Sequence, residues 1–110
     1  MAGFVRSALF AALLVATPAA AQTASQAQDL SNCAGAVAAH AGLDVLSFPN
    51  GASGEWAPVL GAILERLNRE EGVEGMTGRY AASAAKGYWL EQSAAARARV
   101  ANECRARFGS

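Results

Sequence analysis

Two cysteines and one histidine are the side chains of this chain that most readily support metal or nucleophilic chemistry. Cys33 and His40 lie near each other in the sequence, whereas Cys104 lies near the other end. A metal site needs several ligands at close spacing, and covalent haem attachment needs Cys-x-x-Cys-His. The sequence has neither pattern, so it predicts no metal and no cofactor. We interpret His40 as a side chain favoured by the negative end of a helix.

Serine and carboxylate chemistry has no better support in the sequence. Ser53 misses the spacing of a nucleophile elbow because Gly54 follows it directly, and we interpret it as a helix cap. Three glutamates suggest the paired acids of a hydrolase, but they lie beside arginines, as on a solvated charged surface. They are Glu70, Glu71 and Glu74. The glycine-rich segment 72–78 lacks the strand and lysine of a phosphate-binding loop. The sequence therefore predicts a protein that is not an enzyme.

Basic residues are concentrated only near the end of the sequence, at Arg97, Arg99, Arg105 and Arg107. On a helix these side chains spread around the cylinder, and the whole chain balances nine basic against nine acidic residues. No strong field favours nucleic acid as a partner. Arg97 is in line with the apolar positions that follow it. Either the helix begins after Arg97, or its side chain reaches from the core edge towards an acid.

Residues 1–21 have the pattern of an export signal. Arg6 supplies a positive charge, 8–16 are apolar, and small residues precede Gln22, where a peptidase could cut. The apolar run is too short for a permanent transmembrane anchor, and the residues before Cys33 do not fit a lipidation motif. The sequence predicts a periplasmic or secreted protein. In such an oxidising space we expect Cys33 and Cys104 to form one disulfide, with a chain-entropy benefit of roughly 4 kcal/mol.

The remaining residues suffice for a single domain with one modest core. We interpret 22–28 as a flexible leader and 29–110 as the domain. Apolar residues at helical spacing predict a first helix over 29–41, which Gly42 ends, and a second over 55–70, with Pro58 in its first turn. Segment 43–54 is expected to be a loop held by hydrophobic contacts. A short strand at 44–48 is possible, but it has no second strand to pair with.

A third helix is expected to begin with Thr77 as its cap and to carry Tyr80, Ala84, Gly87 and Tyr88 along one side, where the two tyrosines are among the large side chains expected to do most of the packing. Small residues at 81, 82 and 85 would let a neighbouring helix approach closely, and Trp89 would lie on the other side. The chain near Ser93 either bends this helix or starts a fourth. We therefore predict an all-α bundle of three or four helices, with a disulfide joining the first and last as antiparallel neighbours.

No set of residues converges on a reaction, so the leading hypothesis is an exported helical protein that acts by binding an envelope protein. A small-ligand or lipid carrier with an aromatic-lined pocket between helices is one alternative. A holdase-type envelope chaperone is another. The candidate contact residues are Trp89, Tyr88, Trp56 and Arg97. For Trp89, a docking role competes with burial against the loop around Phe48.

Overall fold

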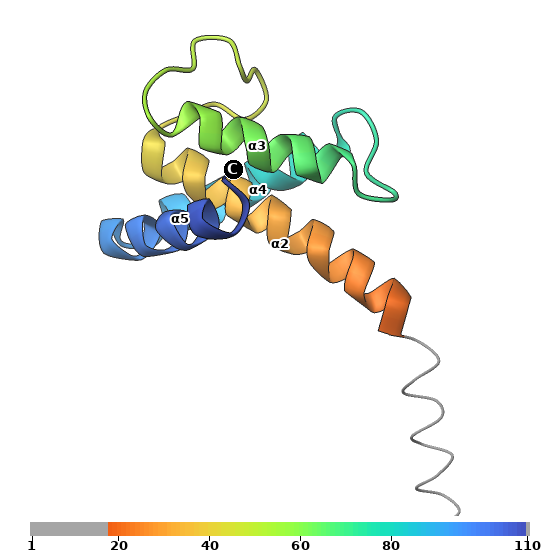
Figure 1. Ribbon diagram of the computed structural model, residues 1–110. Helices are drawn as coiled ribbons and strands as arrows, with labels where there is room; N and C mark the ends of the chain where they lie inside the picture. The colour runs from red at the N-terminus through yellow and green to blue at the C-terminus, as the bar shows by residue number, and fades with distance from the viewer. Residues whose placement is uncertain (1–17, 110) are drawn as a thin grey trace, which may run out of the picture.

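The computed structural model describes residues 18–109, which form four helices and no strand (Figure 1). The helices are α2 (Pro18–Ala41), α3 (Ala57–Asn68), α4 (Thr77–Leu90) and α5 (Ala94–Phe108). This confirms the predicted all-α fold. Ser93 separates α4 from α5, because its side chain accepts a hydrogen bond from the Ala96 N–H at 3.1 Å and so caps α5. The last part of the chain therefore starts a fourth helix and does not continue a bent third one.

The centre of the bundle is α2, and the other three helices pack around it (Figure 1). Residues 33–39 are all buried, so this stretch has no side that faces solvent. Most of its side chains are small, and Val37 is the largest of them. A helix enclosed on every side needs apolar residues all round, and alanine meets that need while letting its neighbours approach.

The start of α2 differs from the prediction. The helix begins at Pro18 and not near Asp29, so the segment 22–28, expected as a leader, is helical. Alanine and glutamine favour helix, and proline is tolerated in the first turn, so nothing before Gly42 breaks the pattern. The predicted export signal lies outside the described residues except for 18–21, which belong to α2.

Gly42 ends α2 as predicted. It adopts a left-handed conformation, with φ of 70°. The N–H of Leu43 then donates to the Ala38 carbonyl at 2.9 Å, which satisfies one of the last carbonyls of the helix. Leu43 itself is buried, so the same turn that closes the helix brings the following loop onto the core.

The stripe of α3 is buried as its spacing predicts, by Val59, Leu60, Ile63, Leu64 and Leu67. The predicted caps of α3 and α4 are wrong. The cap positions are Trp56 and Met76, and neither helix has a side-chain cap. Instead each helix follows a tight turn, in which the Ala57 N–H donates to the Gly54 carbonyl and the Thr77 N–H to the Glu74 carbonyl. Backbone carbonyls of these turns therefore replace the hydroxyl groups expected from Ser53 and Thr77.

The loop that follows α2 contains no strand and is held from two directions. Val45 is buried, and Phe48, which precedes a cis proline, packs on the core. From α4, Arg79 donates to the carbonyls of Val45 and Phe48, at 2.9 and 2.6 Å, and Lys86 donates to the Leu43 carbonyl at 2.6 Å. The hydrophobic contacts expected for this loop are therefore joined by two cationic anchors.

Asp44 shapes the start of the same loop. Hydrogen bonds from the Ser47 side chain and from the Leu46 N–H lower the pKa of Asp44 below its ordinary value, because both stabilise the carboxylate. The carboxylate thus orders the exposed turn that brings Val45 to the core.

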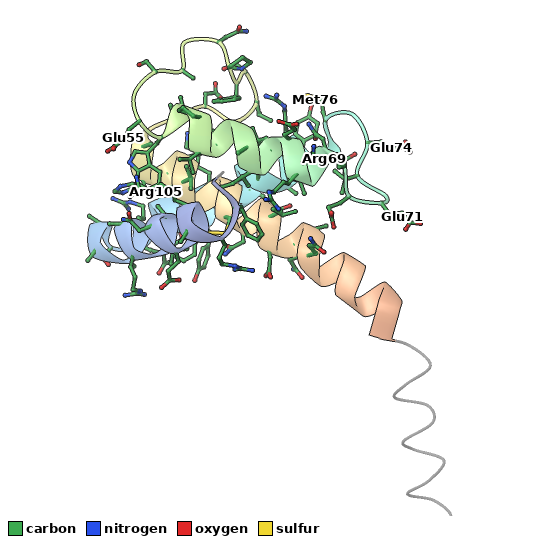
Figure 2. All side chains as sticks on the ribbon, in the orientation of Figure 1. Glu55, Arg69, Glu71, Glu74, Met76 and Arg105 are labelled. Atoms are coloured by element: carbon green, nitrogen blue, oxygen red, sulfur yellow. A yellow bond between two sulfur atoms is a disulfide. The ribbon has the colours of Figure 1, made fainter. Side chains whose placement is uncertain are left out.

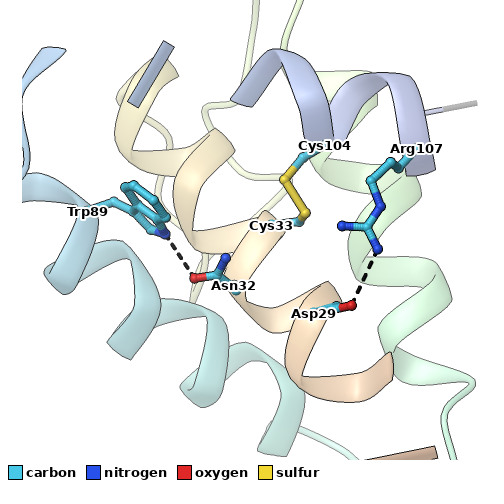
Figure 3. Close-up of a disulfide and its surroundings, with 6 residues drawn as sticks. All are labelled: Asp29, Asn32, Cys33, Trp89, Cys104 and Arg107. Carbon is cyan, nitrogen blue, oxygen red and sulfur yellow. Dashed lines mark hydrogen bonds and ion pairs between the residues drawn. A yellow bond between two sulfur atoms is a disulfide. The ribbon is translucent and has the colours of Figure 1, made fainter. Parts of the chain in front are cut away.

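The disulfide joins α2 to α5 as predicted. The Cα atoms of Cys33 and Cys104 are 5.5 Å apart, and both residues are buried. One turn away, Arg107 forms an ion pair with Asp29 at 3.3 Å (Figure 3). The later residue of α5 thus meets the earlier residue of α2, so the two helices are antiparallel. A disulfide is consistent with an oxidising compartment.

The face of α4 that packs on α2 is not the one the sequence analysis favoured. The inward residues are Gly78, Ala82, Ala85 and Trp89, and the aromatic side that carries Tyr80 and Tyr88 faces solvent. The physical reason is the close approach of the two helices. A Cβ atom placed on Gly35 of α2 would lie 2.5 Å from the Cβ of Ala85. Tyrosines at this contact would hold the helices apart.

Candidate functional site

The four candidate contact residues do not form one site. Trp56 lies where α2, α3 and α5 meet. Its ring packs edge-on against His40, with centroids 5.0 Å apart, and the guanidinium carbon of Arg105 lies 4.3 Å from the Trp56 ring centroid. This aromatic and cationic contact joins three helices. Trp56 and His40 therefore have a structural role. The aromatic residues of α4 belong to another part of the chain.

Arg97 closes the end of α4. Its Nη1 atom donates to the carbonyls of Trp89, Leu90 and Gln92, at 3.4, 3.3 and 2.7 Å. The carbonyls of Trp89 and Leu90 belong to the negative end of α4, where a cation is favoured, and that of Gln92 lies just beyond it. The sequence allows two interpretations, a helix that begins after Arg97 or a side chain that reaches an acid. The helix includes Arg97, and the side chain reaches carbonyl groups.

Replacing Arg97 with alanine should lower the free energy of unfolding by about 2 kcal/mol, because these carbonyls lose a charged hydrogen-bond donor. Arg97→Lys should lose less, since it keeps the charge but not the planar set of donors. Urea unfolding of the three proteins, followed by circular dichroism, measures both effects. Equal midpoints for the wild-type and Arg97→Ala proteins would contradict the assigned role.

Trp89 is half-buried and faces α2. Its indole N–H donates to the Asn32 side-chain oxygen at 3.0 Å (Figure 3). The Tyr88 ring packs edge-on against the Trp89 ring, with centroids 5.1 Å apart. The alternative of a fully exposed tryptophan is therefore wrong, and the adjacent tyrosine is the exposed aromatic residue.

Six residues form what we call the outer face of α4, on the side away from the core. They are Thr77, Tyr80, Ala81, Ala84, Tyr88 and Glu91, and all are exposed. Tyr80 and Tyr88 keep 62% and 57% of their surface accessible, although the sequence analysis placed both among the packing residues. Two large aromatic side chains in solvent on one helix face are unusual for an isolated domain and suggest a contact surface.

An open groove of about 550 Å³ runs beside the outer face. Its α4 wall consists of small residues between Thr77 and Ala85, its α2 wall includes Ala27 and Ser31, and Val73 lies at one end. None of the aromatic candidates lines it. The aromatic-lined pocket expected for a ligand carrier is thus not this groove, and the sequence analysis did not predict the groove. Only the run of alanines and glycine in α4 could have indicated it.

The carboxylates considered and set aside as hydrolase acids lie on the connection between α3 and α4. Glu71 and Glu74 point outwards at its edge (Figure 2). Nearby, Arg69 pairs with Glu65 at 3.1 Å, and both side chains are exposed. This is the solvated charged surface that the sequence analysis expected. Across residues 18–109, no group of His, Cys, Asp or Glu could hold a metal ion.

Within the same part of the chain, no helix is long and apolar enough to cross a bilayer. The chain matches no protein-family model, and comparisons with curated proteins and with solved structures give no match. Among the described residues, the outer face of α4 with its adjoining groove is the surface with the clearest features of a binding site.

Proposed function

We propose that this is an exported, non-enzymatic protein that binds another protein through the outer face of α4. The observation that carries the proposal is the exposure of Tyr80 and Tyr88 on one side of a helix whose opposite side is fixed on α2. Aromatic residues supply most of the energy at many protein interfaces. Here they stand on a rigid element, next to a groove that can accept a side chain.

Export is supported by the pattern of residues 1–21 and by the disulfide, which persists in oxidising compartments. The partner would accordingly be another envelope or secreted protein.

A protein partner fits this surface better than a small ligand. Small-molecule sites usually enclose most of the ligand between apolar and aromatic walls. The groove is open to solvent, and small side chains make up its α4 wall. The tyrosines stand beside the groove and not across it. Such a surface suits a helix or a strand of another protein, which brings its own side chains to fill the space.

The proposal can be tested by photo-crosslinking in the source organism. A photoreactive phenylalanine analogue in place of Tyr80 is expected to crosslink a discrete partner, whereas the same analogue in place of Glu103, exposed on α5, should not. Tyr88→Ala should weaken binding of the identified partner about thirtyfold, the loss that corresponds to about 2 kcal/mol for a central aromatic residue.

Each remaining outcome of this experiment has a definite meaning. No crosslink from Tyr80, or equal crosslinking from both positions, would refute the proposal. Crosslinks from Tyr80 to many unrelated polypeptides would instead support the chaperone alternative.

A further inference from the structure

We propose that the outer face of α4 binds α4 of a second copy of this chain, antiparallel, about a two-fold axis at Ala84. This inference rests on the proposed function, since it names the partner of the same surface. A two-fold interface places one surface patch on both subunits, so the patch must be complementary to itself. The outer face of α4 meets this condition in its spacing, its shape and its charges.

The spacing of the outer face is that of paired helices. Thr77, Ala81, Ala84, Tyr88 and Glu91 follow one another at alternating intervals of four and three residues. This is the heptad spacing with which two packed helices maintain contact along their length. In an antiparallel pair centred on Ala84, residues equally far before and after Ala84 face each other. Tyr88 of one copy is then level with Tyr80 of the other and contacts the adjoining Ala81, and Glu91 is level with Thr77.

The shapes at the two ends of the face are complementary. Tyr88 projects at the C-terminal end of α4, whereas the groove is lined by the N-terminal part of α4, including Gly78 and Ala81. The antiparallel arrangement brings each projecting tyrosine to the groove of the other copy. Ala84, which lines the groove and lies at the axis, is small enough to let the helices cross closely. One chain thus carries both the projection and the recess.

The charges are also complementary. Glu91 lies at the C-terminal cap of α4, where the helix dipole disfavours an acid. The first turn of α4 has no acidic residue and no side-chain cap, so no acid within the helix compensates its positive end. In the pair, each Glu91 lies beside the positive end of the other α4. The cations of α4, Arg79 and Lys86, are held on the loop after α2 and do not cross the contact.

The contact is small, so we expect a reversible dimer. The 14 residues of α4 span about 21 Å at the rise of an α-helix. Interfaces below the standard size are typical of transient complexes. The purified, oxidised protein should therefore change from monomer to dimer between about 1 µM and about 1 mM in sedimentation velocity. Ala84→Glu, which brings two like charges together at the axis, should abolish the dimer without changing the helical content.

Two matched cysteine variants test the position of the axis. Under mild oxidation Ala84→Cys should crosslink two copies, because the introduced thiols meet at the axis within the reach of a disulfide. Ala81→Cys, on the same exposed line, should not, because in the pair the two introduced thiols would lie about 9 Å apart along the helices. A Glu91→Lys variant should keep or raise the stability of the monomer yet weaken the dimer about tenfold, since it reverses the charge facing the partner.

The result that would overturn the inference is a monomer throughout this concentration range. Equal crosslinking of Ala84→Cys and Ala81→Cys, or of neither, would also overturn it. Failure here is distinguishable from failure of the proposed function. If the photoreactive analogue at Tyr80 captures a different protein while Ala84→Cys gives no dimer, the second copy is excluded and the binding surface stands. If neither experiment gives a product, both proposals fall.

Discussion

A Gly35→Ala variant is expected to lose about 3 kcal/mol of its free energy of unfolding, because a well-packed helix contact cannot accept the added methyl group. The new Cβ would lie 2.5 Å from both the Ala85 Cβ and the Lys86 backbone nitrogen. Two of the nearest atoms belong to the backbone of α4, so no side-chain rotation relieves the overlap. The helices must separate, which also disturbs the hydrogen bond from Lys86 to the Leu43 carbonyl. Urea unfolding followed by circular dichroism measures the loss.

The matched control is Gly87→Ala, the same substitution inside α4. A Cβ at Gly87 meets no atom within 4 Å, so only the helix propensity changes. That variant should gain about 0.5 to 1 kcal/mol. If both variants gain stability, the close approach of α2 and α4 is wrong.

Removal of the disulfide is expected to have the largest effect of all. A Cys33→Ala/Cys104→Ala double variant should lose about 4 kcal/mol of its free energy of unfolding, because the bond closes a long loop in the unfolded chain. The cysteines are separated by 71 residues. Small domains have a total stability of about 5 to 15 kcal/mol, so much of the margin would disappear.

Reduction provides an independent measurement of the same term. A reducing agent should lower the urea midpoint of the wild-type protein to nearly that of the double variant and leave the double variant unchanged. Identical midpoints for oxidised and reduced wild-type protein would show that the bond does not stabilise this fold.

The features that the sequence predicts correctly are those with one strong local signal. The stripe from Val59 to Leu67 could form only one amphipathic helix, and Gly42 was the evident end of α2. The cysteine pair follows from the expected oxidising compartment and from the place of the two cysteines on the first and last helices. For the α3 stripe and for Gly42, burial or conformational preference acts through nearby residues, so tertiary context is hardly needed.

The orientation of α4 could not be predicted because two physical preferences favour opposite sides of this helix. Burial of large aromatic residues favours the side with Tyr80 and Tyr88, whereas close approach favours the side with Ala82 and Ala85. The outcome depends on Gly35, far away in the sequence, which opens the surface of α2 to a helix with small side chains. Choosing between the two sides requires knowing which segments become neighbours.

The candidate residues show the same limit. Arg97 stands out in the sequence, but its partners are backbone carbonyls at and just after the end of α4, a position that the sequence does not locate. Trp89 lies outside the stripe that Tyr80 and Tyr88 define. That stripe, however, is the exposed side of α4, so Trp89 is on the side that faces α2. The groove depends on where α2 and α4 separate, and the run of small residues in α4 does not by itself locate that point.

The bridge between α2 and α5 also orders events during the life of each molecule. After Cys33 has been made, 71 residues must be added before its partner sulfur exists. A nascent chain therefore carries an unpaired thiol through most of its synthesis, and oxidation marks the arrival of the last helix beside the first. If Cys33 formed a disulfide with a thiol of another molecule during that interval, the chain would be trapped before the other helices had packed around α2.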